Sequence, residues 1–158
     1  MNIVQYAGEL MPILETKSKL ARSLQGLHLF HYSLSSCSQR VRLSLEEKGL
    51  AWESHHIDLP AQEHATDWYQ QINPAGLVPT LVHDGRLITE SMDILLYLEA
   101  QFPDTPLAAV DAETENQLLQ QADDLQGALK LLTHEFLLKP KQKMSPKQVE
   151  DFANRHQN

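Results

Sequence analysis

The chain has 158 residues, of which 42% are hydrophobic and 22% charged, a balance typical of a folded globular protein and not of a disordered one. Its formal net charge of −8 disfavours nucleic acid and anionic membrane surfaces as partners, because both attract clustered Lys and Arg. No apolar run approaches the roughly 20 residues needed to cross a bilayer, and the start does not resemble a signal peptide, so we expect a cytoplasmic protein.

The first 26 residues contain no motif with recognisable chemistry. A loose helical stripe runs from Ile13 to Leu24, but Pro12 interrupts it and Gly26 ends it. We therefore expect residues 1–26 to form a flexible N-terminal extension.

From residue 27 the pattern predicts an α/β domain over 27–103. The expected elements are a strand at 27–32, a helix at 37–49, a strand at 51–57, a helix near 65–72, strands near 79–83 and 86–88, and a helix at 91–102. The Asp84-Gly85 step between the last two strands is a strong hairpin signal. The order is therefore βαβ-α-ββα, with a mixed four-stranded sheet.

Beyond this domain the composition becomes that of an all-α region. A Pro-containing segment at 104–110 is the expected linker, and 111–158 is the expected partial helical domain. Apolar residues recur every three or four positions across 111–138, which predicts an amphipathic helix. A second helix start signal follows at Ser145-Pro146.

Two helices leave much of this apolar stripe uncovered. Three explanations remain open: contacts in a homodimer, an incomplete sequence, or partial exposure of residues such as Leu125 and Leu132.

A serine-rich turn, Ser35-Ser36-Cys37-Ser38, joins the first predicted strand of the domain to its first helix. Hydroxyl groups and unpaired N–H groups at a helix N-terminus favour a thiolate over a thiol. A thiol of pKa about 8.5 needs a fall of about 2 units to be mostly ionised at neutral pH, and one hydroxyl hydrogen bond plus a helix terminus supplies an effect of that size. We expect thiol chemistry at this turn.

Two later segments form a binding corner for an extended peptide. Val78-Pro79 follows a Gly-containing turn, where a cis peptide bond would turn the preceding N–H and C=O outward to the ligand. Glu90 and Ser91 begin a helix, where N–H groups and a hydroxyl bind a carboxylate and Glu90 meets an amine. Singly, these are more often an edge strand and a helix cap, but coincidence is improbable when they follow the serine-rich turn in this order and spacing.

From about Leu27 to Leu107 the chain resembles the N-terminal, thioredoxin-like half of cytosolic glutathione transferases. Ser35-Ser36-Cys37-Ser38-x-Arg40-Val41-Arg42 is similar to the zeta class, whose members include maleylacetoacetate isomerase, although Gln39 stands where that class commonly has Trp.

Other segments are similar to different members of that family. The segment from His64 to Pro74 and the Glu90-Ser91 pair look more like bacterial transferases, including the glutathione-dependent β-aryl etherases, and like the ganglioside-induced differentiation-associated proteins.

Carried over residue by residue, the resemblance implies that Ser35 is catalytic and hydrogen-bonds the glutathione sulfur. The glutathione-binding residues that it implies are Ser36, Cys37, His64, Val78, Pro79, Glu90 and Ser91.

In this implied arrangement Val78 pairs with the cysteinyl backbone, and Glu90 and Ser91 hold the γ-glutamyl end. His64 lies near the glycyl end. Leu77 departs from the family pattern, because many relatives carry Lys or Gln there to reach the glycyl carboxylate.

The single cysteine excludes an intramolecular disulfide and a cysteine-rich zinc cluster, and no metal site is indicated. Cys37 is expected to pack, since omega-class transferases carry their cysteine at the position of Ser35.

The resemblance implies a detoxification enzyme, a homodimer that uses glutathione as co-substrate and transfers it to a small hydrophobic electrophile. The alternatives are a glutathione-dependent isomerase of the maleylacetoacetate type and a noncatalytic interaction module. The family normally continues through further helices that build the electrophile pocket.

Overall fold

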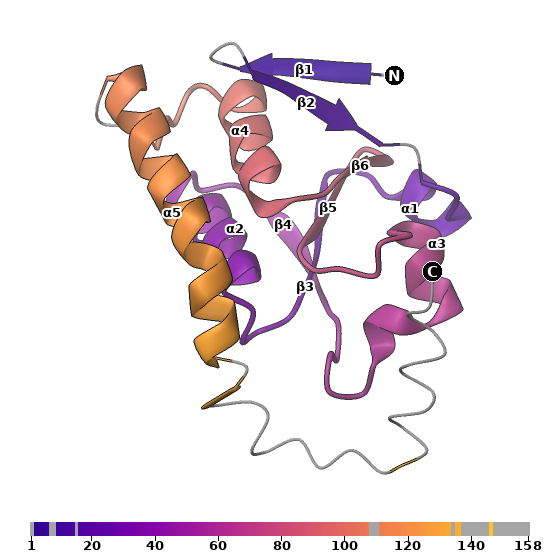
Figure 1. Cartoon of the computed structure of the whole chain (residues 1–158). Coiled ribbons are helices and arrows are strands. Elements are labelled where there is room, and N and C mark those ends of the chain that lie inside the picture. Colours follow the sequence, from indigo (N-terminus) through magenta and orange to yellow (C-terminus); the bar gives the residue numbers. More distant parts are fainter. Residues whose placement is uncertain are drawn as a thin grey trace.

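A four-stranded sheet lies at the centre of the computed structural model, which describes residues 2–6, 9–14, 16–107, 111–133, 135, 136 and 146. Its strands are β3 (Leu27–His31), β4 (Trp52–His56), β5 (Thr80–His83) and β6 (Arg86–Ile88), in the order β4-β3-β5-β6. β3 and β4 are parallel, whereas β5 is antiparallel to both of its neighbours (Figure 1). The predicted mixed sheet is confirmed.

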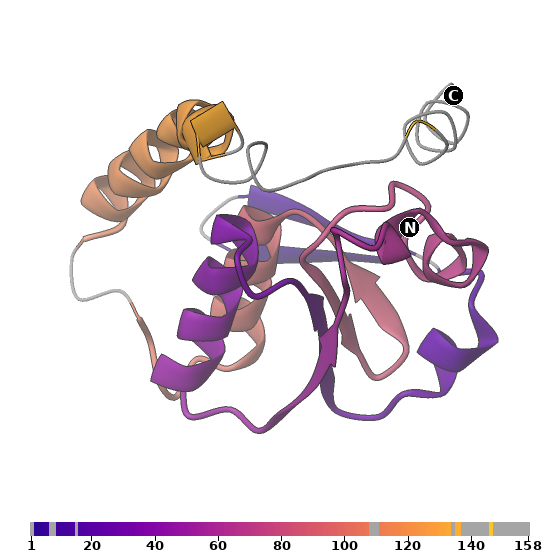
Figure 2. The same ribbon diagram turned by 90° about the horizontal axis from the view of Figure 1, so that it is seen from below.

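Helices cover both faces of this sheet (Figure 2). α2 (Ser36–Glu47) and α4 (Ser91–Gln101) pack on one face. α1 (Lys19–Ser23) and α3 (Asp67–Ile72) pack on the other, with the short 3-10 helix η1 (Glu63–Ala65) preceding α3.

Alternation along the strands separates the two hydrophobic layers. Leu27, Leu29 and Leu81 belong to the layer under α2 and α4. Phe30 and Val82 belong to the layer on the opposite face. The two central strands, β3 and β5, are therefore buried on both faces, which fixes their register firmly.

The predicted hairpin between β5 and β6 is also confirmed. Asp84 and Gly85 both have positive φ, at 50° and 76°, as the twist of a two-residue turn requires. A Cβ on Gly85 would lie 2.7 Å from the carbonyl oxygen of Arg22, so only glycine fits there.

The prediction of a flexible extension over residues 1–26 is wrong for the part of it that the structure describes. β1 (Asn2–Tyr6) and β2 (Glu9–Ile13) form an antiparallel pair. Leu14 then exchanges two backbone hydrogen bonds with Leu87 of β6, at 2.8 and 3.3 Å.

Polar contacts attach the rest of this segment to α3. The Thr16 hydroxyl donates to the carbonyls of Gln71 and Ile72, which lie in the last helical turn and lack partners within the helix. Ser18 caps the start of α1, and Ala21 is fully buried. Helical periodicity does not reveal an attachment made by two hydroxyl groups and one small side chain.

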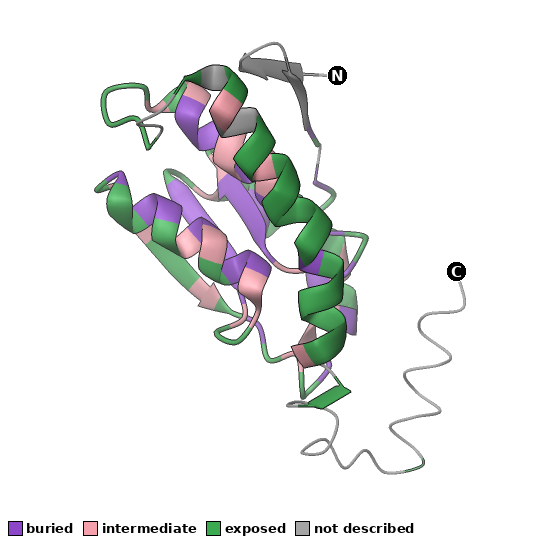
Figure 3. Ribbon diagram, turned by 60° about the vertical axis from the view of Figure 1, so that its left-hand side comes forward, coloured by how far each residue is buried: buried purple, intermediate pink, exposed green. Residues whose placement is uncertain are grey.

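The long helix expected over 111–138 is present as α5 (Ala112–Thr133). Most of α5 is coloured as exposed in Figure 3. Leu125 and Leu132 are 68% and 56% exposed, which is compatible with each of the three explanations. The second helix start, at Ser145, lies outside the described residues. No described helix is both long and apolar enough to cross a membrane.

Candidate functional site

The segments that carry the predicted site residues meet at one end of the sheet. Because β3 and β5 are antiparallel, with Phe30 paired to Thr80, the turn after β3 lies beside the loop before β5. Ile88, at the end of β6, pairs with Leu81 near the start of β5, so the beginning of α4 reaches the same end. Two helix N-termini and one irregular loop thus converge.

Ser35 is the N-cap residue of α2. Its backbone is extended, with φ −74° and ψ 119°, and its Oγ accepts a hydrogen bond from the N–H of Ser38 at 3.2 Å. The side chain is half-buried. Since Oγ accepts this bond, the hydroxyl hydrogen is left to be donated elsewhere.

Ser36 and Cys37 follow in the first turn of α2. The Oγ of Ser36 accepts a hydrogen bond from the Gln126 side chain of α5, at 2.5 Å. Cys37 is a free cysteine, only 8% exposed, which agrees with the packing role expected of it.

The Val78–Pro79 peptide bond is cis, as predicted. Pro79 is buried and Val78 is half-buried. In the described part of the chain, neither the N–H nor the C=O of Val78 forms a backbone hydrogen bond. A backbone that pairs with an extended ligand is expected to have this property.

The Leu77 carbonyl anchors this loop from within. It accepts hydrogen bonds from the Tyr69 hydroxyl at 2.7 Å and from Nδ2 of Asn73 at 3.1 Å. Burial raises the pKa of Tyr69 to about 12, so its hydroxyl keeps the proton that it donates. The Leu77 side chain itself is 56% exposed and offers no polar group.

His64 lies in η1, against the turn that precedes this loop. Gly76 in that turn has φ 62°, and a Cβ there would lie 2.9 Å from the His64 carbonyl oxygen. The backbones of His64 and Gly76 are thus in direct contact, so His64, whose side chain is half-buried, belongs to the same corner.

Glu90 and Ser91 begin α4. Glu90 is exposed, makes no side-chain cap, and has φ 61° and ψ 121°. A non-glycine residue with positive φ costs about 1–3 kcal/mol, and such strained residues cluster at functional sites. Glu90 thus occupies the N-cap position of α4, as the simpler interpretation expected, but its side chain forms no hydrogen bond to the helix.

Arg40 is a site residue to which the sequence analysis assigned no role. Its guanidinium donates to Ser91 Oγ at 3.3 Å and to Met92 Sδ at 2.8 Å, both in the first turn of α4. It also lies 3.7 Å from the carboxylate of Asp123 in α5. A cation thus lies beside the predicted carboxylate-binding serine. The position of Arg40, one turn into α2, was the sequence signal that could have identified it as a site residue.

Gln126 was missed as well. It is 8% exposed and is the one buried residue among the α5 residues with described exposure. Its Oε1 accepts from Arg40 at 3.1 Å, and its Nε2 donates to Ser36. A polar residue interrupting the apolar stripe between Ala122 and Leu129 is the sequence signal that marks it.

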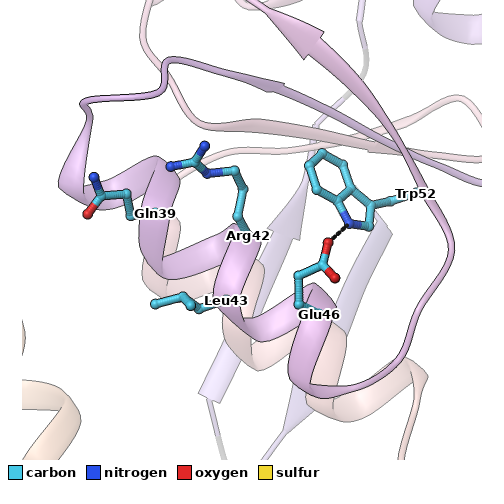
Figure 4. Close-up of a pocket in the computed structure, with 5 residues that line it drawn as sticks. All are labelled: Gln39, Arg42, Leu43, Glu46 and Trp52. Atoms are coloured by element: carbon cyan, nitrogen blue, oxygen red, sulfur yellow. Dashed lines mark hydrogen bonds between the residues drawn. The ribbon is translucent and has the colours of Figure 1, made fainter.

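A separate hollow of about 430 Å³ lies on the exposed side of α2, facing β4 (Figure 4). It is lined by Gln39, Arg42, Leu43, Glu46 and Trp52. The indole of Trp52 donates to the Glu46 carboxylate at 3.0 Å. None of the predicted site residues lines it. The described residues include no cluster of three His, Cys, Asp or Glu side chains suited to a metal ion.

Comparison with known proteins places residues 34–101 under a family model described as glutathione S-transferase, N-terminal domain. A glutathione S-transferase zeta class protein of Euphorbia esula is 34% identical over 131 residues, which cover 82% of this chain and 58% of the relative. A probable maleylacetoacetate isomerase of Caenorhabditis elegans is 47% identical over 83 residues, covering 52% of this chain and 38% of the relative.

Among solved structures, β-etherase LigF from Sphingobium sp. strain SYK-6 matches with a TM-score of 0.72 and 31% identity, over 82% of this chain and 56% of that one. This likeness confirms the predicted thioredoxin-like α/β domain followed by a helical region. The chain spans about half the length of the relatives that it matches. The family match includes the whole corner from Ser35 to Ser91, but not α5.

Proposed function

Residues 34–101 match the model of the glutathione S-transferase N-terminal domain, and on that basis we propose that this chain belongs to the family, binds glutathione and lowers the pKa of the glutathione thiol. The observation that carries the proposal is the meeting of the α2 N-terminus, the Leu77–Pro79 loop and the α4 N-terminus at one end of the sheet. These regions are assigned to the sulfur, the cysteinyl backbone and the γ-glutamyl end of the tripeptide, in that order.

Ser35 is the proposed catalytic residue. Its free hydroxyl hydrogen is donated to the glutathione sulfur at the positive end of α2. Lowering a thiol pKa by about 2 units requires about 3 kcal/mol. A hydrogen bond to a charged atom supplies about 1.5–3 kcal/mol, and a helix terminus adds about 0.3–1. Ser36 and Cys37 line the same turn.

The γ-glutamyl end is assigned to Glu90 and Ser91. Ser91 Oγ already accepts a hydrogen bond from Arg40, so its hydroxyl hydrogen is available to a carboxylate. The Arg40 cation and the N–H groups of α4 favour the same anion. The exposed carboxylate of Glu90 pairs with the ammonium group.

The remaining two residues of glutathione lie along the loop. The Val78 backbone pairs with the cysteinyl residue, and the buried Pro79 shapes the loop. His64 faces the glycyl end. Because Leu77 provides neither charge nor hydrogen bond there, the glycyl carboxylate contributes least to affinity.

The bound thiolate attacks an electrophilic carbon of a small hydrophobic substrate, in the cytoplasm, as part of detoxification. We assign residues 27–103 to the glutathione-binding domain, 104–110 to the linker, and 111–158 to part of a helical domain. A homodimer would cover exposed apolar residues of α5 such as Leu125.

An isomerase of the maleylacetoacetate type is the alternative reaction, favoured by the 47% identity to the probable isomerase. A noncatalytic interaction module is a second candidate. The observation in its favour is the exposed apolar face of α5, formed by Leu118, Leu125, Leu129 and Leu132.

Calorimetric titration of the whole chain with glutathione tests the proposal. We expect binding by the parent, and a loss of about tenfold in affinity for Ser91→Ala, which removes a hydrogen bond to a charged group. Ser35→Ala should still bind, but with a bound thiol whose pKa, followed by thiolate absorbance, is about 1–2 units higher. Ser33→Ala, at an exposed position beside the turn, is the matched control.

Absence of binding by the parent would refute the proposal and leave the interaction module. Binding without a lowered thiol pKa would refute only the catalytic role of Ser35.

A further inference from the structure

The contacts of Gln126 fix the direction of each hydrogen bond that its amide makes. An arginine side chain has donors but no acceptor, so the group facing Arg40 must be the amide oxygen. The amide nitrogen then faces Ser36, and an amide nitrogen can only donate. Ser36 Oγ is therefore an acceptor in this contact, and its hydroxyl hydrogen points elsewhere.

We propose that Gln126 is a positioning residue for the glutathione site, which holds Ser36 as an acceptor so that the Ser36 hydroxyl donates to the bound sulfur. This inference rests on the proposed function and extends it to a residue outside the family match. A hydroxyl oxygen that accepts one hydrogen bond becomes a better donor, because bonds in a chain polarise one another. Ser36 thus assists Ser35 in stabilising the thiolate.

Gln126 acts at the same time on the neighbouring anion site. By accepting from Nη2 of Arg40, it orients the guanidinium whose Nη1 reaches Ser91. The Arg40 side chain is 17% exposed, so this orientation is held largely away from water. One side chain of α5 thereby controls a donor at each of two helix N-termini.

A purely structural role for Gln126 makes a different prediction. Gln126 also attaches α5 to α2, together with the 3.7 Å ion pair of Arg40 and Asp123. If attachment were its whole role, any substitution that keeps α5 in place would leave the thiol pKa unchanged.

Gln126→Glu separates these roles. A carboxylate keeps its acceptor for Arg40, now with opposite charge, so α5 stays attached. The carboxylate also places an acceptor next to Ser36. The Ser36 hydroxyl must then donate to this carboxylate and can no longer donate to the sulfur. We expect the pKa of the bound thiol to rise by about 1 unit. Gln121→Glu places the same charge on the exposed surface of α5 and should leave that pKa unchanged.

The negative charge of Glu at position 126 also acts on the thiol directly, and a Ser36→Ala background isolates that effect. There, Gln126→Glu should raise the thiol pKa by less than half of its shift in the parent. An equal shift in both backgrounds would overturn the inference. If the Glu variant does not fold, Gln126→Met provides the same comparison, with a rise expected only when Ser36 is present.

Failure of this inference is distinguishable from failure of the proposed function. If the parent binds glutathione and lowers its thiol pKa, but Gln126→Glu behaves like Gln121→Glu, only the role of Gln126 is refuted. If the parent does not bind glutathione, both are refuted.

Discussion

Lys48 and Glu99 form a buried ion pair, with Nζ of Lys48 2.8 Å from Oε1 of Glu99 and side chains that are 0% and 6% exposed. The ammonium group also donates to the Thr105 carbonyl at 2.7 Å, and Glu99 accepts from the N–H of Leu107. The pair therefore joins the end of α2 to α4 and to the segment that leads to α5. Its charges have partners on both sides, as buried charges require.

Replacing Glu99 with Gln should lower the free energy of unfolding by about 3–5 kcal/mol, because the Lys48 charge would stay buried without a counter-charge. Denaturant titration measures this loss. Glu47 is exposed at the end of α2, next to Lys48. The free energy of unfolding of Glu47→Gln should stay within about 0.5 kcal/mol of the parent value. The double variant Lys48→Met/Glu99→Leu should be more stable than Glu99→Gln; equal or lower stability would contradict this account.

The Tyr69 hydroxyl holds the loop that we assign to the cysteinyl residue of glutathione. Tyr69→Phe removes its 2.7 Å bond to the Leu77 carbonyl and should cost about 1–1.5 kcal/mol of stability. The loosened loop should weaken glutathione binding about 3–10-fold. Tyr97→Phe removes a bond of the same length, to Nδ1 of His83, away from the corner. It should lower stability equally without affecting calorimetric affinity; weaker binding by both variants would exclude a local effect.

Thr16 is the residue that most directly tests the attachment of the N-terminal segment. Thr16→Val keeps the shape but removes the hydroxyl that reaches the carbonyls of Gln71 and Ile72. We expect a loss of about 1–3 kcal/mol in unfolding free energy, since buried carbonyls would lose a donor. Thr105→Val, at an exposed side chain, is the control. Equal stability of the two variants would mean that water replaces the Thr16 hydroxyl.

His31 makes the stability of the fold depend on pH. Burial, and then the charges of Arg42, His56 and His55, lower the pKa of His31 from 6.5 to about 4. The unfolded chain therefore binds a proton between pH 6.5 and 4 that the folded chain does not. Uptake of this proton favours the unfolded chain. The contribution of neutral His31 to the free energy of unfolding is therefore fully present above pH 6.5 and is lost as the pH falls towards 4.

As the pH is lowered from 7 to 4, the free energy of unfolding should fall less steeply in His31→Asn than in the parent. Part of the slope should remain, because burial also lowers the pKa of His55 and of His83. Identical slopes in the two proteins would show that the pKa of His31 is the same in the folded and the unfolded chain.

Local sequence patterns were sufficient for much of the fold. The Asp84-Gly85 turn and the apolar spacing of α4 and α5 identified elements whose bounds differ from the structure by a few residues. The order of motifs also located the corner, because antiparallel pairing of β3 and β5 brings the ends of distant segments together. The Glu90 backbone, with positive φ, could not be inferred from its residue type.

Contacts between distant polar side chains were not predictable in this way. Arg40 and Gln126 are 86 positions apart, and only the packing of α5 against α2 brings their side chains together. Thr16 similarly reaches a helix end 55 positions away. Neither contact produces a repeating pattern in the sequence, so neither could be predicted from one sequence.

The pairing of Leu14 with Leu87 also covers one edge of the central sheet. The outward N–H and C=O of the middle residue of β6 are already used, so a strand from another molecule cannot add there. Among the described strands of the central sheet, β4 is left as the open edge, and it carries the exposed charge of Glu53. For the central sheet, the N-terminal segment thus leaves one edge open to pairing with another molecule, and that edge is protected by charge.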